Sequence, residues 1–277
     1  MILDLTKGIC TTKQYQAWKF PGGEIHFKFI EFADNLEEFQ ILTRLNSSDD
    51  IILLLLVVDT IKKDYNRPFI SLSIPYMPYQ QADRNFKTGE CFSLKTIANL
   101  INSMNLDQVF VYDSHSDVSL GLINNSIAID NYNFIKKVLS DINDENIIIC
   151  STDAGSFKKI FKLCEKLDYH GDIVTCLKSR NHETNEITTI VPEFDETKPV
   201  LIIDDIALGS KTFLNIRRQI KNKQVYLAVS HGVFNENIDK LETDFTKIYT
   251  TNSRRDISVS ENIKIFDIFK EIIKNDK

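Results

Sequence analysis

The regular alternation of short apolar runs with amphipathic stretches constrains the fold of this chain most strongly. Runs of branched apolar residues predict strands at 51–58, 69–76, 108–113, 146–152, 172–177, 199–204, 225–231 and 247–252. Between two of them, apolar residues recur at helical spacing, namely Ile97, Leu100, Ile101 and Met104. This spacing predicts a helix over 91–105, for which Ser93 is an available cap. Strand followed by helix, repeated, predicts an α/β fold whose parallel sheets are covered on both faces.

A second amphipathic stretch, 153–168, follows the predicted strand at 146–152. Its expected apolar face consists of Phe157, Ile160, Phe161 and Cys164. The beginning of the chain differs, because in "WKFPGGEIHFKF" bulky residues alternate on either side of the turn at 21–23. This alternation predicts a β-hairpin.

The length of 277 residues is sufficient for two domains of ordinary size. Strands that end in acidic residues occur in both halves of the chain, which suggests two related α/β units. The polar stretch "DINDEN", residues 141–146, is the best candidate for the link between them. We therefore expect one domain over 1–142 and a second over 143–277.

Composition limits the partners and the location that we expect. The 33 basic and 39 acidic residues give a formal charge of -6, which indicates neither nucleic acid nor a membrane surface as a partner. The longest apolar run is too short to span a bilayer, and the beginning of the chain lacks a signal-peptide pattern. The five cysteines form no C-x-x-C pair, so we expect reduced thiols in a cytoplasmic protein.

The stretch "VLIIDDIALGSKTF", Val200 to Phe213, places two adjacent carboxylates after an apolar run. Neighbouring carboxylates repel each other and therefore need a cation, hydroxyl donors or water. Because ligands of open α/β sheets bind at the carboxyl ends of strands, Asp204 and Asp205 indicate a sugar or metal site. The stretch is not a nucleotide-binding P-loop, since the chain has no G-x-x-x-x-G-K-[ST].

Three other strand ends carry candidate residues. Asp113 and His115 in "DSHSD" lie two apart, so they could share one ion, although a histidine bonded to a backbone carbonyl fits the triplet equally well. Asp153 precedes a helix start suited to an anion, and the alternative is that it only caps that helix. Lys178 and Arg180 follow another strand and would either be solvated or stabilise charge on a polyphosphate.

In their order, these segments resemble the ribose-phosphate pyrophosphokinases, the phosphoribosyl pyrophosphate synthetases, from about Lys19 to Asp256. "FPGGE" resembles the adenine-binding hairpin F-x-D/N-G-E, "IPYMPYQQADR" resembles P-Y-x-P-Y-x-R-Q-D-R, and "DSHSD" resembles the metal motif D-L-H. "STDAGS" resembles an aspartate segment near the metal, "LKSR" the K-x-R of the flexible catalytic loop, and "LIIDDIALGSKT" the motif D-D-x-x-D-T-G-G-T. The resemblance implies two type I phosphoribosyltransferase-like α/β domains with parallel sheets, plus the N-terminal hairpin.

The resemblance also implies an activity in nucleotide biosynthesis. The anomeric hydroxyl of a ribose 5-phosphate would attack the β-phosphorus of ATP, with Mg²⁺ as cofactor and AMP as leaving group. The implied catalytic residues are Lys178 and Arg180, and the implied metal ligands are Asp113, His115 and Asp153. In the first domain, ATP would contact Phe20, Glu24, Gln81, Asp83 and His115. In the second, the ribose phosphate would contact Asp204, Asp205, Gly209, Ser210, Lys211 and Thr212.

Departures from the motifs bear on the acceptor. The family's Arg-Gln pair is Gln81-Ala82 here, and the hairpin has Gly22 in place of Asp or Asn. D-T-G-G-T has become L-G-S-K-T, residues 208–212, which exchanges a carboxylate for leucine and introduces a lysine. Such a loop suits a phosphate that continues into a larger group, so ADP-ribose is a predicted acceptor, with a role in NAD metabolism. A diverged loop that still binds ribose 5-phosphate is the other interpretation.

The resemblance has a further implication for assembly, because the family hairpin contacts adenine in a neighbouring subunit. We therefore expect a homo-oligomer with a shared adenine site, unless Phe20 is a core residue. Two other functions stay open, a non-catalytic subunit associated with such synthetases and a phosphoribosyltransferase. The retained Lys178 and Arg180 disfavour the first, and the presence of both α/β halves disfavours the second.

Overall fold

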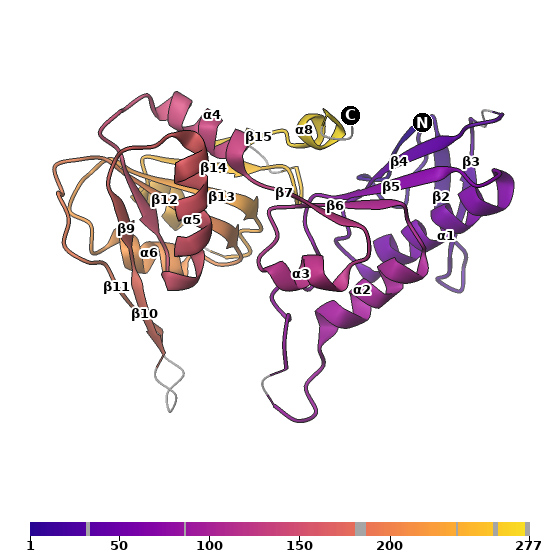
Figure 1. The fold of residues 1–277 in the computed structure, drawn as a ribbon, viewed down its shortest axis with the longest axis horizontal. Helices are drawn as coiled ribbons and strands as arrows, with labels where there is room; N and C mark the ends of the chain where they lie inside the picture. Colours follow the sequence, from indigo (N-terminus) through magenta and orange to yellow (C-terminus); the bar gives the residue numbers. More distant parts are fainter. Residues whose placement is uncertain (32–33, 86, 181–186, 237, 257–259, 275–277) are drawn as a thin grey trace. The chain divides into compact units, whose positions relative to one another are not determined.

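A computed structural model describes residues 1–31, 34–85, 87–180, 187–236, 238–256 and 260–274, without the side chains of residues 179, 180, 187 and 274. The chain forms two compact units, Met1–Asp130 with Phe269–Lys277 and Asn131–Ile268, which we call unit 1 and unit 2. Each is built around a parallel sheet (Figure 1), so the α/β prediction is confirmed. The division differs from the predicted boundary after residue 142, because α4 (Tyr132–Ile142) packs with the helix α5 of unit 2.

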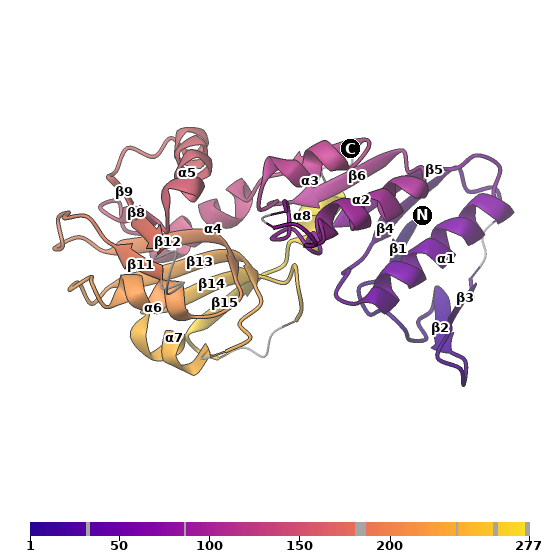
Figure 2. The ribbon, with the colours of Figure 1, turned by 90° about the horizontal axis from the view of Figure 1, so that it is seen from below.

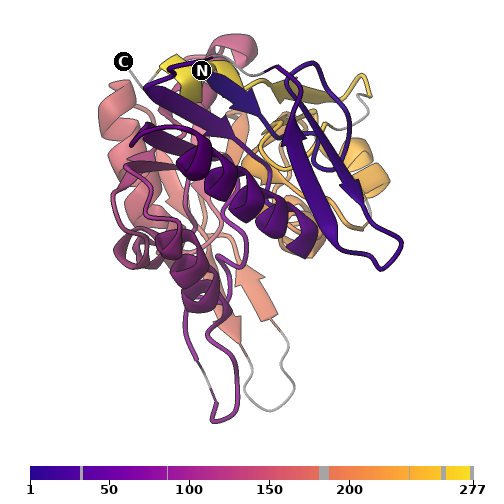
Figure 3. The ribbon, with the colours of Figure 1, turned by 90° about the vertical axis from the view of Figure 1, so that its right-hand side faces the viewer.

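Among the described residues, five parallel strands form the sheet of unit 1, in the order β1-β4-β5-β6-β7. They are β1 (Ile2–Asp4), β4 (Glu38–Leu42), β5 (Phe69–Ile74), β6 (Gln108–Tyr112) and β7 (Ser126–Ile129). The helices are α1 (Ser48–Asp64), α2 (Ser93–Ser103), α3 (Asp117–Leu122) and α8 (Phe269–Lys274). Figure 3 shows α1 running across this sheet, where buried residues such as Leu54 and Val57 share one core with Phe39 and Leu72 of the strands.

Residues 51–58 form part of α1, and the prediction of a strand there is wrong. A capping box starts the helix at Ser47, whose hydroxyl accepts the Asp50 N–H while the Asp50 carboxylate accepts the Ser47 N–H. The apolar positions then continue through buried Ile61, well beyond the run itself. A short apolar run cannot by itself distinguish a buried strand from a buried helix, and here the cap and the length decide.

The predicted hairpin is confirmed as β2 (Tyr15–Lys19) and β3 (Ile25–Phe29), which pair antiparallel as a separate two-stranded sheet. Tyr15, Ala17 and Phe27 turn one face of the hairpin into the core of unit 1. The predicted helix at 91–105 is α2, but Phe92 occupies its cap position and Ser93 is the first helical residue, so the predicted Ser93 cap is wrong.

Unit 2 contains a parallel sheet of six described strands, in the order β15-β14-β13-β12-β8-β9. Their bounds are β8 (Ile148–Ser151), β9 (Ile173–Thr175), β12 (Val200–Ala207), β13 (Val225–Gly232), β14 (Lys247–Thr251) and β15 (Ile263–Phe266). The covering helices are α4, α5 (Ala154–Leu167), α6 (Lys211–Arg217) and α7 (Ile238–Asp244). Figure 2 shows α4 and α5 on one face and α6 and α7 on the other.

The strand β12 demonstrates why this sheet is apolar on both faces. Leu201 and Ile203 join the core under α4 and α5, whereas Val200 and Ile202 join the core under α6 and α7. An antiparallel arm, β10 (Leu177–Arg180) with β11 (Ile187–Ile190), follows β9. Coverage on both faces was predicted, and it accounts for the continuous apolar run of β12.

The apolar face of α5 differs from the predicted one. Ile160, Leu163 and Cys164 are buried, whereas Phe157 and Phe161 are 38 % and 46 % exposed and contact each other instead. The buried face of α5 thus includes Leu163, which was not in the predicted apolar face, and excludes Phe157 and Phe161. All five cysteines are free thiols, as predicted. None of the helices in the described ranges is both long and apolar enough to cross a membrane.

Candidate functional site

Asp204 and Asp205 lie within β12, which continues to Ala207 rather than ending at the carboxylates as predicted. The neighbouring strand β8 pairs with β12 only as far as Ser151, opposite Ile203. From Asp204 onward, β12 pairs with β13 but no longer with β8 among the described residues. The acidic pair therefore lies where one edge of β12 has lost its neighbouring strand β8. This is the carboxyl edge of a parallel sheet, at which ligands of such sheets bind.

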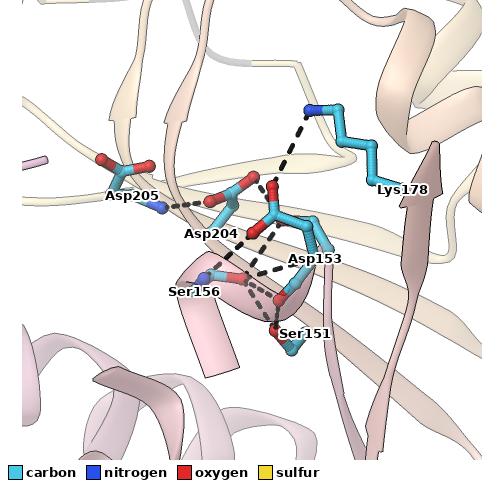
Figure 4. A network of polar contacts seen from close by, with 7 residues as sticks. Ser151, Asp153, Ser156, Lys178, Asp204 and Asp205 are labelled. Carbon is cyan, nitrogen blue, oxygen red and sulfur yellow. Dashed lines mark hydrogen bonds and ion pairs between the residues drawn. The ribbon is translucent and has the colours of Figure 1, made fainter. Parts of the chain in front are cut away.

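Two donors already hold the Asp204 carboxylate. Thr152 donates its hydroxyl to Oδ2 at 2.8 Å. The backbone N–H of Asp205 donates to Oδ1 at 2.9 Å (Figure 4). Burial, followed by repulsion from Asp205, nevertheless raises the pKa of Asp204 to about 8. The group is therefore held in place but incompletely compensated, so hydroxyl donors or a cation from a ligand would stabilise its ionised form.

Asp153 caps α5 and also faces a cation. Its Oδ1 accepts the N–H of Ser156 at 3.0 Å, and the Asp153 N–H donates to the Ser156 hydroxyl oxygen at 3.4 Å, which completes a capping box. Its other oxygen, Oδ2, lies 3.8 Å from Nζ of Lys178. The capping alternative is thus correct, and it leaves one carboxylate oxygen directed at the arm (Figure 4).

The arm places one of the two predicted catalytic cations. Lys178 lies on β10 opposite Thr189, and its side chain is about one third exposed. Arg180 ends the same strand opposite Ile187, but its side chain lies outside the described part of the structure. The contact with Asp153 connects Lys178 to the edge of the sheet that carries the acidic pair.

The predicted phosphate loop, residues 208–212, joins β12 to α6. Leu208 and Gly209 are exposed, whereas Ser210 is 1 % exposed and occupies the cap position of α6. Among the described residues the Ser210 hydroxyl has no hydrogen-bond partner. Lys211 and Thr212 form the first residues of α6, so Lys211 presents its charge on the surface.

In unit 1, the loops after β5 and β6 bring several predicted ATP and metal residues together. Asp83 is buried and accepts two bonds from the Arg84 guanidinium, at 2.8 and 3.1 Å, and one from the Ser116 hydroxyl at 2.9 Å. The Arg84 bonds hold the pKa of Asp83 below its ordinary value, so this carboxylate is ionised at neutral pH. It serves here as an anchor between the two loops.

Asp113 and His115 follow β6 directly. Asp113 is 2 % exposed and has a φ of +42°, a left-handed conformation that costs energy for a non-glycine residue. His115 is exposed, and its backbone N–H donates to Oε1 of Gln80 at 3.0 Å. Gln81, the predicted ATP contact, is exposed, whereas the neighbouring Gln80 is fully buried.

The hairpin places Phe20 and Glu24 at its tip. Phe20 is 45 % exposed and lies beside the His26 and Trp18 rings, so it is not a core residue. Its N–H donates to the backbone oxygen of Glu24 at 2.8 Å, closing the turn. A side chain at position 22 would meet the Glu24 carboxylate, the end of an exposed and flexible side chain that can move aside, so this contact does not by itself require Gly22 where the motif has Asp or Asn.

The described residues do not form a metal site made of protein ligands alone. Within the described ranges, no group of three or more His, Cys, Asp or Glu side chains could hold a metal ion. Mg²⁺ bound with ATP takes most of its ligands from phosphate and water, so the carboxylates of Asp113 and Asp153 fit that role. Asp113 and His115 belong to unit 1 and Asp153 to unit 2, and their joint action stays a prediction.

Comparison with known proteins gives a consistent result over most of the chain. Residues 7–104 match the family model for the N-terminal domain of ribose phosphate pyrophosphokinase. A ribose-phosphate pyrophosphokinase of Thermosipho africanus is 29 % identical over 248 residues, 85 % of this chain and 76 % of that protein. Another, from Thermotoga maritima, is 25 % identical over an alignment that covers 96 % of this chain and 85 % of the relative.

The chain is similar to the ribose-phosphate pyrophosphokinases over most of its length. Its fold agrees with a solved member, the phosphoribosylpyrophosphate synthetase of Mycobacterium smegmatis. The TM-score is 0.80 at 18 % identity, with coverage of 96 % of this chain and 89 % of that one. At this identity the structural match supports the fold alone. These matches confirm the family resemblance drawn from the motifs.

Some residues that shape these clusters were not predicted. Thr152 orients Asp204, Ser116 holds Asp83, and Gln80 holds the backbone of His115. Each lies within two residues of a predicted one, but hydroxyls and amides in loops carry no distinctive spacing. Only the three-dimensional contact reveals which neighbour acts as the donor or acceptor.

Proposed function

We propose that this chain is catalytically active and transfers the β,γ-diphosphate of ATP to the anomeric hydroxyl of a phosphorylated ribose. The observation that carries the proposal is the joint placement, in unit 2, of a restrained acidic pair and a cationic arm. Thr152 holds Asp204, and Lys178 lies 3.8 Å from Asp153 in the segment that follows Thr152. Diphosphate transfer needs such an arrangement, because catalysis consists mainly of positioning and of neutralising phosphate charge.

Each residue then has a chemical role. Asp204 and Asp205 would accept hydrogen bonds from the ribose hydroxyls and fix the ring. Lys178 and Arg180 would stabilise the charge that develops on the transferring phosphoryl group. Mg²⁺, held by Asp113, His115 and Asp153 together with the phosphates, would supply the remaining charge neutralisation.

For the acceptor, we propose a ribose whose 5-phosphate continues into a larger group, ADP-ribose in particular. Three features of the loop at 208–212 support this. Space around Gly209 is open, since an added Cβ there would meet no atom within 4 Å. Leu208 is 38 % exposed where the family motif has a carboxylate, and Lys211 places a mobile point charge at the surface. The exposed position of Gly209 and the charge of Lys211 support a second phosphate at this loop.

The deciding experiment supplies Mg²⁺–ATP with either ribose 5-phosphate or ADP-ribose and measures AMP and the 1-diphosphorylated product. We expect AMP release with both acceptors and a higher kcat/KM for ADP-ribose. The variant Leu208→Asp restores the motif carboxylate and should shift the ratio toward ribose 5-phosphate. Release with ribose 5-phosphate only would exclude the larger acceptor, and no release with either would indicate a non-catalytic subunit.

A further inference from the structure

Gln80 is a fully buried glutamine whose side chain contacts the backbone of a predicted ATP and metal residue. Its Oε1 accepts the N–H of His115 at 3.0 Å, across 35 positions of the chain. A backbone N–H can only donate, so the amide oxygen must face His115 and the orientation of the amide is fixed. Nε2 then points elsewhere, and it is buried without a hydrogen-bond partner in the described part of the chain.

A second contact joins the same two segments at Ser116, the residue after His115. The Ser116 hydroxyl donates to Asp83 at 2.9 Å, and Asp83 is itself held by Arg84. The segment after β5 thus grips the segment after β6 at two consecutive residues. Both segments contain a left-handed residue, Tyr79 with a φ of +59° and Asp113 with +42°. Such backbone strain persists only where surrounding contacts enforce it.

Packing alone does not account for a glutamine at this position. A buried amide with an unpaired NH₂ destabilises the fold, whereas an apolar side chain of similar shape would avoid that penalty. What the amide supplies and an apolar group cannot is an acceptor for the His115 N–H. The contact is therefore directed at the loop, not at the core.

We propose that Gln80 is a positioning residue that fixes the 113–116 loop so that Asp113 and His115 are preorganised for Mg²⁺–ATP. This inference rests on the proposed function and deepens it. The motif that revealed the family leaves the equivalent of Gln80 unspecified, and the expected Arg-Gln pair beside it is Gln81-Ala82. Gln80 would thus give this chain an ordering contact of its own within an altered ATP segment.

The test compares Gln80→Met, which retains the length but loses the acceptor, with Gln80→Glu, which retains an acceptor oxygen. Amide hydrogen exchange of the peptide that contains His115 reports the contact directly. We expect exchange at least tenfold faster in Gln80→Met and partly restored protection in Gln80→Glu. Calorimetry with Mg²⁺–ATP should give a Kd about tenfold higher in Gln80→Met, the size expected for one lost hydrogen bond. KM should rise in the same proportion while kcat changes less, with Tm unchanged or higher.

The matched control is Gln40→Met, which removes another buried glutamine of unit 1, on β4. It should leave exchange at His115 and the Kd for Mg²⁺–ATP as in the wild type. Equal exchange and equal Kd in Gln80→Met and the wild type would overturn the inference, as would a fall in Tm with no change in Kd. If the wild type binds Mg²⁺–ATP but releases no AMP, the proposed function fails while exchange and Kd still decide the role of Gln80.

Discussion

The hydroxyl of Thr152 lies 2.8 Å from Oδ2 of Asp204 and donates to it, joining the loop after β8 to the neighbouring strand β12. The bond fixes the direction of a carboxylate that is otherwise poorly compensated. Because burial disfavours its ionised form and Asp205 presents a second negative charge beside it, the pKa of Asp204 lies far above the ordinary range of an aspartate. This has a measurable consequence for stability.

Asp204→Asn should stabilise the protein increasingly as the pH rises above about 4. Burial raises the folded pKa to about 8 from an ordinary 3.8, so the folded state binds more protons than the unfolded state between these values. The contribution of Asp204 is therefore fully present below about pH 4 and is lost as the pH rises through 8. We expect Tm of the variant to exceed the wild type by about 4 °C or more at pH 8.5 and to equal it at pH 4.

Calorimetric scans at four or five pH values check this expectation. Glu165→Gln, an exposed carboxylate on α5, is the control and should show no pH-dependent difference. An equal shift of Tm for Asp204→Asn at every pH would contradict the assigned titration.

Lys178→Ala and Arg180→Ala should each reduce kcat severely while Tm stays close to the wild type. Loss of one contact to the developing charge typically lowers the rate about 100- to 1000-fold. Steady-state AMP release with Mg²⁺–ATP and the preferred acceptor measures the effect. Lys221→Ala, on an exposed lysine of unit 2, is the control. Turnover near the wild-type value in both arm variants would remove the proposed mechanism.

Asp141→Asn should destabilise unit 2 at neutral pH but not in acid. Lys247 donates to Oδ2 of Asp141 at 2.9 Å and Lys264 donates to Oδ1, and these bonds hold the pKa of Asp141 well below its ordinary value. A depressed pKa contributes stability above the ordinary value near 4 and loses it as the pH falls below that value. For a partly exposed pair, the loss of Tm should be about 2–6 °C at pH 7.

Thermal unfolding at pH 7 and pH 2.5 checks the Asp141 prediction. The two curves of variant and wild type should separate at pH 7 and approach each other at pH 2.5. Glu145→Gln, exposed after the end of α4, should show neither difference. A larger loss of Tm for Asp141→Asn at pH 2.5 than at pH 7 would contradict the lowered pKa of Asp141.

Phe20→Ala and Glu24→Ala should impair ATP use without unfolding unit 1, because both residues lie at the exposed tip of the hairpin. If the adenine site is shared between subunits, light scattering should show a homo-oligomer, and the variants should raise KM for ATP about tenfold or more. Ala substitution of Ile30, an exposed apolar residue after β3, is the control. A fully active monomer would exclude the shared site.

Most central strands could be predicted from the sequence, because a strand that is buried on both faces consists of consecutive apolar residues. β12 and β13 illustrate this, since each pairs with two neighbours and lies between helices. The sequence did not predict edge strands such as β1 and β7, because they are short and carry polar residues. Residues 51–58 were assigned to a strand instead of a helix, because a continuous apolar run shows neither the twofold spacing of a strand nor the 3.6-residue spacing of a helix. Motif order singled out Asp153, Asp204 and Lys178 as candidates. It could not reveal Thr152 or Gln80, whose roles depend on contacts between distant loops.

The division of labour between the two oxygens of Asp153 restricts which substitutions the chain can tolerate there. Oδ1 starts α5 through the Ser156 N–H, and Oδ2 faces Lys178. Alanine would fray the helix and release the lysine together, so a loss of activity in that variant would mix two causes. Asparagine can still cap the helix but carries no charge. Asp153→Asn and Asp153→Ala together therefore separate the loss of the helix cap from the loss of the charge that faces Lys178.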